Sequence, residues 1–233
     1  MGKIVAIGGG KYDNGEIMNI ARHIVSLSGK ENPSVVFLPT AGMDNTDGDE
    51  PIEHAFRECG CSSYETLLLT DESLSDEKIH STITGADVIY AGGGNLKFLM
   101  DTWKRTGVDR YVREAFDNGT VLSGLSSGAM CWFKEGYDDC GEEHAFIFID
   151  CVGILPYCNC PHFESKSWQR FKKAIKTRSI SGIACENGAA IVYDDGKYYP
   201  IHGNEGGRVF LFDSENKFKK RRLTKRRCEK MKL

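Results

Sequence analysis

The chain has 233 residues, of which 40% are hydrophobic and 27% are charged, and its formal net charge at pH 7 is −3. This length and composition are typical of a globular α/β protein with a sizeable core. The slightly acidic charge predicts no nucleic-acid partner, and no apolar stretch is long enough to span a membrane. Nine cysteines, an odd number, without an export signal argue against a disulfide framework. We therefore expect a cytoplasmic protein.

The first half of the chain alternates short apolar runs with segments of helical periodicity. Strands are expected over 3–7, 33–42, 64–70, 87–95 and 120–126. Helices are expected over 15–27, 51–59, 76–84 and 96–117, the last with a break at Gly107. Continuous apolar strands separated by helices are typical of a parallel sheet that is covered on both faces. The pattern therefore predicts an α/β fold with a mostly parallel sheet.

After Gly128 the pattern changes to consecutive strands. We expect strand and loop over 144–156, a helix over 164–176, and strands over 182–203 and 206–213. Asp195-Gly196 is a strong hairpin signal within the third of these segments. Antiparallel strands should thus be added to the parallel core. We expect one domain over 1–215 and a solvated basic tail over 216–233.

The segment Gly124-Leu125-Ser126-Ser127-Gly128 follows the last strand of the first half and matches the pattern G-x-S-x-G. This pattern is typical of a nucleophile elbow, a tight strand-to-helix turn whose neighbouring residues must be small because the nucleophile's backbone is strained. Ser126 would then stand above the sheet edge, where amides at a helix N-terminus can stabilise an oxyanion. A serine-rich surface loop is the alternative, and the strand before the motif favours the elbow.

A serine nucleophile needs a base, and the chain offers six histidines. We favour His162, because it follows an apolar strand and a proline and so belongs to the same sheet rim as Ser126. A third group should orient its imidazole ring. Glu186 interrupts the apolar stretch 182–193, whereas Asp139 lies in an acidic run after the elbow. An acid within an apolar strand needs a partner, so we prefer Glu186 and keep Asp139 as the alternative.

Glycine-rich loops also end on the expected rim. They are compatible with a nucleotide site, but neither G-x-G-x-x-G nor G-x-x-x-x-G-K-[ST] occurs. The loop "AGGGN" (91–95) can instead bring a backbone N–H to Ser126 as a second oxyanion donor.

Several segments together resemble peptidase family S51, the dipeptidase E group that also includes cyanophycinase. They run in order along nearly the whole chain except the basic tail: "AIGGG", "VVFLPTA", "AGGGN", "GLSSGAMCWF", "PHF" and "ENGAAI". The resemblance implies a flavodoxin-like α/β fold related to class I glutamine amidotransferases, with a serine in place of their cysteine. It implies Ser126 as nucleophile and His162 as base, with Glu186 or Asp139 as the third member. The oxyanion and the substrate are expected at Ser127, Gly93, Gly94 and Asn95.

The family is best known for removing an N-terminal aspartate from small peptides, which requires a cation for the substrate side chain. The arginine expected for this role is replaced here, at about Ser167, and Lys166, Arg170 or Lys172 would have to substitute. We therefore expect a serine peptidase that acts on small peptides, with aspartyl specificity left open. It should need no metal or cofactor and should be a monomer or homodimer. An esterase or amidase with the same triad, or a catalytically silent amidotransferase-like binding protein, is the alternative.

Overall fold

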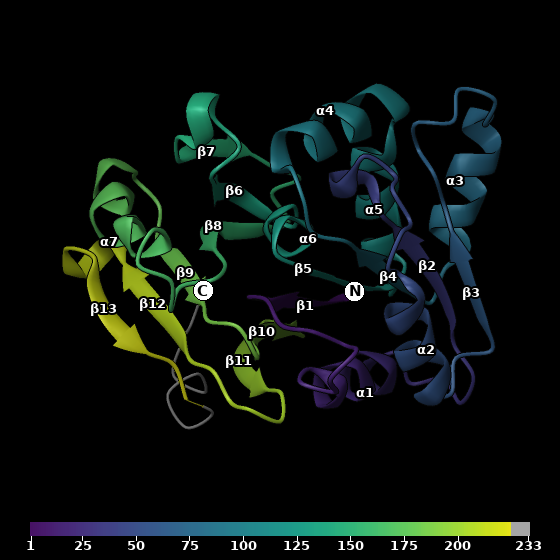
Figure 1. Cartoon of the computed structure of the whole chain (residues 1–233), viewed down its shortest axis with the longest axis horizontal. Coiled ribbons are helices and arrows are strands. Elements are labelled where there is room, and N and C mark those ends of the chain that lie inside the picture. The colour runs from purple at the N-terminus through teal and green to yellow at the C-terminus, as the bar shows by residue number, and fades with distance from the viewer. Residues whose placement is uncertain (225–233) are drawn as a thin grey trace.

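The structure is a computed structural model that describes residues 1–224 (Figure 1). A seven-stranded sheet forms its larger part. Its central strands are parallel and follow the order β1 (Lys3–Ile7), β5 (Val121–Leu125), β4 (Val88–Ala91), β2 (Ser34–Leu38) and β3 (Ser63–Thr66). Beyond β1, the antiparallel strands β10 (Ala189–Asp194) and β11 (Lys197–His202) complete the sheet. The hairpin predicted at Asp195-Gly196 joins these two strands.

Helices cover both faces of this sheet, as Figure 1 shows. Helices α1 (Met18–Leu27) and α2 (Glu50–Glu58) pack on one face, and α3 (Asp76–Gly85), α4 (Leu96–Thr106) and α5 (Val108–Asp117) pack on the other. Successive residues of a strand therefore enter different cores: Val35 and Phe37 join α1 and α2, whereas Val36 and Leu38 join the opposite helices. This two-sided burial is the physical reason for the uninterrupted apolar runs in the sequence. The predicted break at Gly107 is also present, in the left-handed conformation (φ 75°).

A second sheet of six strands lies beside the first. Its order is β13 (Lys219–Arg222), β12 (Val209–Asp213), β9 (Gly182–Cys185), β8 (Leu155–Cys160), β6 (Phe133–Asp138) and β7 (Ile147–Asp150). Strands β6, β8 and β9 are parallel, and the outer strands are antiparallel to their neighbours. The short helix α6 (Ser127–Met130) links β5 of the first sheet to β6 of the second. The predicted α/β fold, mostly parallel in its main sheet and extended by antiparallel strands, is confirmed.

Three details of the second half differ from the sequence-based expectation. Strand β6 was not expected, because its apolar pattern is interrupted by Glu135, which is buried and accepts a hydrogen bond from Arg178 Nε at 2.8 Å. The helix expected over 164–176 is a set of short helical turns, of which only Phe171–Ala174 (α7) is α-helical. The basic segment 216–233, expected to be a solvated tail, contributes the strand β13, which pairs with β12. Residues 225–233 of this segment lie outside the described part.

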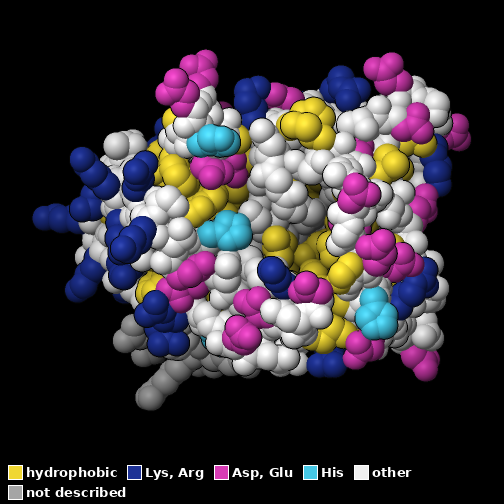
Figure 2. Space-filling model, viewed as in Figure 1, with side chains coloured by type: hydrophobic (Ala, Val, Ile, Leu, Met, Phe, Trp, Pro, Cys, Tyr) yellow, Lys and Arg dark blue, Asp and Glu magenta, His cyan; other side chains and the backbone are white. Residues whose placement is uncertain are grey.

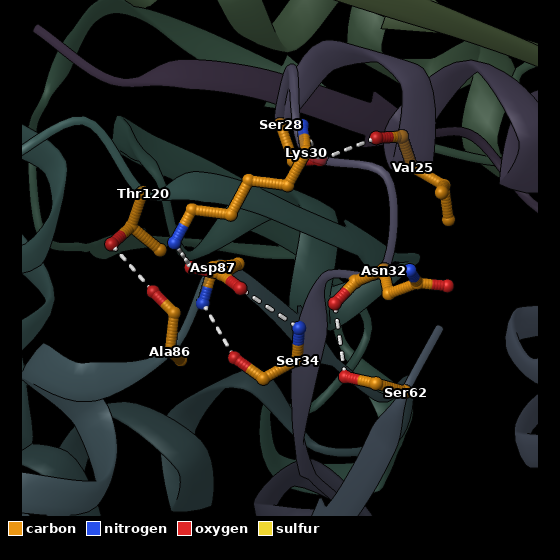
Figure 3. A network of polar contacts seen from close by, with 9 residues as sticks. All are labelled: Val25, Ser28, Lys30, Asn32, Ser34, Ser62, Ala86, Asp87 and Thr120. Atoms are coloured by element: carbon orange, nitrogen blue, oxygen red, sulfur yellow. Dashed lines mark hydrogen bonds and ion pairs between the residues drawn. The ribbon is translucent and has the colours of Figure 1, made fainter. Parts of the chain in front are cut away.

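A polar network ties together the amino ends of the parallel strands, at the edge opposite their carboxyl ends (Figure 3). The Asp87 carboxylate accepts from the Ser34 N–H at 2.9 Å and forms an ion pair with Lys30. Partial burial alone would raise the pKa of Asp87, but hydrogen bonds from Lys30 and Ser34 outweigh it and the pKa is lowered. Thr120 Oγ1 donates to the Ala86 carbonyl at 2.9 Å. These contacts hold β2, β4 and β5 in register, so that their carboxyl ends meet at one rim.

No helix within residues 1–224 is both long enough and apolar enough to cross a membrane.

Candidate active site

Ser126 occupies a strained turn between β5 and α6. Its φ of 57° lies in the left-handed region, which is uncommon for a residue with a side chain. The flanking glycines leave no room for a Cβ atom: one on Gly124 would overlap the Gly128 carbonyl, and one on Gly128 would overlap the Ala91 carbonyl. The G-x-S-x-G spacing is therefore what this turn requires sterically.

His162 reaches Ser126 from the second sheet. It follows β8, and its own N–H donates to the Gly8 carbonyl of the first sheet at 2.9 Å. Its Nε2 lies 2.9 Å from Ser126 Oγ. The indole ring of Trp168 packs edge-on against the imidazole, with 5.3 Å between ring centroids. The hydrogen bond and the ring contact hold the imidazole against the serine hydroxyl.

The other ring nitrogen of His162 contacts Asn187, which the sequence analysis did not single out. The distance from His162 Nδ1 to Asn187 Oδ1 is 2.7 Å. Because the amide oxygen only accepts, Nδ1 carries the proton and Nε2 is left to accept the serine proton. The Asn187 N–H in turn donates to Glu164 Oε2 at 2.9 Å. A Cβ atom on Gly9 would overlap both Asn187 Oδ1 and the imidazole ring, so the loop after β1 must carry glycine here.

The two carboxylates considered from the sequence lie elsewhere. Glu186 is 6% exposed, and both of its oxygens accept from the Arg208 guanidinium at 2.7 Å. The inference that an acid at this position needs a partner was sound, but the partner is an arginine and not His162. Asp139 is half-exposed at the end of β6. Since Ser126 and Asn187 occupy both ring nitrogens of His162, neither carboxylate orients the imidazole.

The loop after β4 lies next to Ser126. A Cβ atom on Gly93 would come within 3.2 Å of Ser126 Cβ, which places the Gly93 backbone beside the nucleophile. Ser127 Oγ donates to the Gly94 carbonyl at 2.7 Å and thereby links this loop to the elbow. Asn95 caps α4, its side chain accepting from the Phe98 N–H at 2.9 Å.

Beneath Ser127 lies the buried carboxyl group of Asp138, with Oδ2 3.3 Å from Ser127 Oγ. Burial raises the pKa of Asp138. Burial, together with the neighbouring Asp138, also raises the pKa of the Cys140 thiol, to about 12. The sulfur of Cys140 is therefore in its neutral form at ordinary pH and is not an activated nucleophile.

The cations considered for substrate aspartate lie around α7. Lys166 and Arg170 are exposed. The ammonium group of Lys172 donates to Gln169 Oε1 at 2.8 Å and lies over the Phe163 ring. Ser167, which the sequence analysis considered as the replacement of the expected arginine, has its hydroxyl 3.1 Å from that of Ser165.

A hollow of about 230 Å³ opens beside the nucleophile, lined in part by Gly93 and Leu125. Figure 2 shows apolar side chains exposed in a hollow on this face of the molecule. A larger hollow of about 740 Å³ lies between α1 and α2 and is lined by charged groups such as Arg22, Glu50 and Glu58. Among residues 1–224, no cluster of three or more His, Cys, Asp or Glu side chains is placed to hold a metal ion.

A strained serine with a histidine on its hydroxyl is an arrangement typical of hydrolases, and comparison with known proteins agrees. Residues 4–201 match the model of peptidase family S51. The chain belongs to peptidase family S51. The predicted resemblance is thereby confirmed, and the protein is a peptidase.

The matches to individual relatives cover most of this peptidase. It is 32% identical over 215 residues to an uncharacterized peptidase, YgaJ, of Bacillus subtilis, covering 90% of this chain and 91% of the relative. It is 24% identical over 190 residues to Peptidase E of Haemophilus influenzae, covering 78% and 83% of the two chains. The crystal structure of a peptidase from an acI-B1 Actinobacterium superposes with a TM-score of 0.72 at 19% identity, covering 96% of this chain and 94% of the other. The last comparison shows a shared fold.

Proposed function

We propose that this S51 peptidase hydrolyses small peptides by covalent catalysis, with Ser126 as nucleophile, His162 as base and Asn187 as the group that orients the base. The observation that carries the proposal is the 2.9 Å contact between Ser126 Oγ and His162 Nε2 at a turn where Ser126 has a strained backbone. Strain of this kind is retained at functional sites, where it directs a side chain toward the substrate.

In the first step, Ser126 Oγ attacks the carbonyl carbon of the scissile bond while His162 Nε2 takes the hydroxyl proton. The carbonyl oxygen becomes an oxyanion. Backbone N–H groups of Ser127, in the first turn of α6, and of Gly93 are its donors, since first-turn amides have no acceptor within the helix. The 2.7 Å contact between Ser127 Oγ and the Gly94 carbonyl supports this assignment, because it keeps the two donor segments adjacent.

In the second step, His162 gives its proton to the departing amine, and the peptide bond breaks to leave an ester on Ser126. A water molecule, deprotonated by the same His162 Nε2, then attacks the ester carbonyl. The serine leaves as its protonated hydroxyl and the acid product is released. Throughout the cycle, Asn187 accepts from Nδ1–H of His162, which keeps the ring in the tautomer that the first step needs. No step uses Glu186 or Asp139.

An esterase or an amidase would use the same steps, so the chemistry alone does not choose the substrate. Membership of a peptidase family favours peptides. A catalytically silent binding protein is disfavoured, because it has no use for a strained serine that is hydrogen-bonded to a histidine. The Haemophilus relative is named Peptidase E. In this chain, however, the sequence analysis finds no arginine near Ser167, where a cation for the substrate aspartate is expected. We therefore propose small peptides without strong aspartyl preference.

The test is a dipeptide library incubated with the wild type, with Ser126→Ala and with Ser81→Ala, a matched control on the exposed side of α3. Released amino acids are scored, and circular dichroism checks the fold of each protein. Wild type and Ser81→Ala should release amino acids, and Ser126→Ala should be slower by at least about a thousandfold. A sulfonyl fluoride should also add mass to Ser126 in the wild type. Undiminished hydrolysis by folded Ser126→Ala would refute the proposal.

A further inference from the structure

We propose that the 230 Å³ hollow beside Ser126 is a subsite for a bulky apolar side chain on one of the two residues that flank the scissile bond. The inference rests on the proposed function of Ser126 and extends it to a substrate class. It concerns peptides with leucine-like or phenylalanine-like residues, which differ from the acidic peptides that a cationic pocket would select.

The position of the hollow ties it to the reaction. Gly93 and Leu125 are both part of its wall. Leu125 directly precedes the nucleophile, and the Gly93 backbone is adjacent to Ser126 Cβ. A peptide whose carbonyl oxygen points at the Gly93 and Ser127 amides therefore has a side chain next to this hollow.

Most of the side chains that line the hollow are apolar or aromatic, and they come from four separate segments. Tyr12 follows β1, Pro51 and Ile52 begin α2, Tyr90 belongs to β4, and Leu125 ends β5. Figure 2 shows the resulting apolar surface in a hollow of this face. Burying an apolar side chain against such walls removes it from water, and this stabilises the bound substrate in proportion to the area covered.

The hollow has a rigid floor. Tyr90 is 1% exposed and packs within the core, with its ring centroid 5.2 Å from that of Phe56 and 6.0 Å from that of Tyr12. The Tyr90 side chain therefore cannot move aside without disturbing the core, because interiors are close-packed. A preformed apolar pocket binds without the cost of ordering its walls.

Charge in the wall does not favour an acidic side chain. The charged residues that line the hollow are Lys11 and Asp13, which have opposite signs and lie two positions apart. Any attraction of Lys11 for a substrate carboxylate is opposed by the repulsion from Asp13. An uncharged side chain experiences neither the attraction nor the repulsion, so the wall favours apolar substrate side chains over acidic ones.

The volume fits a single side chain. At about 230 Å³ the hollow is larger than an apolar cavity of about 150 Å³ that accepts a benzene ring. A benzyl or an isobutyl group therefore fits, whereas a methyl group leaves most of the space unfilled. One added methylene in an apolar pocket changes kcat/KM by about tenfold or more, so leucine or phenylalanine should exceed alanine by about tenfold to a hundredfold.

The experiment measures kcat/KM for two dipeptide series, X-Ala and Ala-X, with X as Ala, Leu, Phe or Asp. The wild type should prefer Leu or Phe over Ala by at least about tenfold in one series, and that series identifies the flanking residue that enters the hollow. Ile52→Glu places a carboxylate in the wall, away from the groups that perform the reaction. It should lower kcat/KM for the preferred substrate by at least about tenfold and for Ala-Ala by less than about threefold.

Two further variants make the test decisive. Leu68→Glu is a matched control, because Leu68 is 37% exposed and lies outside the hollow's wall, and it should leave all rates unchanged. Ile52→Trp fills the hollow without adding charge and should abolish the preference for Phe while Ala-Ala is still cleaved. This variant answers the question if Ile52→Glu does not fold.

The outcomes separate the subsite from the proposed function. Hydrolysis that depends on Ser126 but shows no preference for Leu or Phe in either series overturns the subsite alone. An equal fall for every substrate in both folded Ile52 variants also overturns it, since that result indicates a general structural effect. Hydrolysis that survives Ser126→Ala, or no hydrolysis of any dipeptide by the wild type, overturns the proposed function and the subsite together.

Discussion

Replacing Asn187 by alanine tests the least expected member of the site. The change removes the amide oxygen that lies 2.7 Å from His162 Nδ1 and leaves the rest of the β9–β10 turn in place. During the reaction His162 becomes an imidazolium, so the lost contact is a hydrogen bond to a charged group. Such bonds contribute about 1.5–3 kcal/mol. At 1.36 kcal/mol for each factor of ten, kcat should fall by about tenfold to about 150-fold.

Glu186→Gln is the matched comparison, because it alters the adjacent side chain. A glutamine keeps the shape of Glu186 and one oxygen that can accept from Arg208, but its amide nitrogen faces the second guanidinium N–H and cannot accept from it. Because the Glu186 side chain is buried, the loss of that hydrogen bond should cost about 1–3 kcal/mol of stability. Because Glu186 does not contact His162, kcat should change by less than about threefold.

The assay is steady-state kinetics on the best dipeptide from the library, with urea unfolding to verify the fold of each variant. Asn187→Asp completes the series. Its carboxylate stabilises the imidazolium at least as well as the amide does, so kcat should be retained or rise. If Glu186→Gln is folded and slower than Asn187→Ala, the assignment of Asn187 as the orienting group is refuted.

Further expectations concern a glycine, an ion pair and substrate charge. Gly9→Ala should lower kcat by at least about tenfold, because its methyl group would displace both Asn187 and His162. Unchanged kinetics would contradict this and show that the loop after β1 can shift to accommodate the methyl group. Asp87 has a lowered pKa in the folded state, so its stabilisation is present above the ordinary value of about 3.9 and is lost as pH falls through the folded value. Asp87→Asn should therefore lower the free energy of unfolding by about 1–2 kcal/mol at pH 7, and the difference in urea midpoint should shrink as pH falls through the lowered folded-state pKa of Asp87; a difference that does not shrink in acid would contradict this. Asp-Leu should exceed Ala-Leu by about tenfold or less in kcat/KM, and a preference of about a thousandfold would mean that Arg170 or a nearby lysine supplies the missing cation.

Local chemistry made several features predictable from the sequence. The turn around Ser126 needs small neighbours, and the glycines at 124 and 128 make this turn recognisable from five consecutive residues. The first-half strands were recognisable because both of their faces are buried, which demands continuous apolar residues. Even the break between α4 and α5 was visible in Gly107, because a left-handed residue there favours glycine.

The role of Asn187 was decided only by the tertiary structure. Glu186 and Asn187 are neighbours in the chain, and either side chain can accept a hydrogen bond from an imidazole. In the folded chain the Glu186 carboxylate accepts from Arg208, whereas the Asn187 side chain contacts His162. These partners are 22 and 25 residues away in sequence, so no local pattern distinguishes the two.

The same reason applies to β6 and to the apolar hollow. Glu135 made β6 look unlike a buried strand, because its partner Arg178 is 43 residues further along the chain. The walls of the hollow come from the loop after β1, the start of α2 and the ends of β4 and β5. Sequence by itself determines the turns and strands whose requirements are met by their own residues. Which charges are paired, which side chain holds the histidine and which surfaces meet at the serine depend on contacts between distant segments, and only the folded chain supplies those.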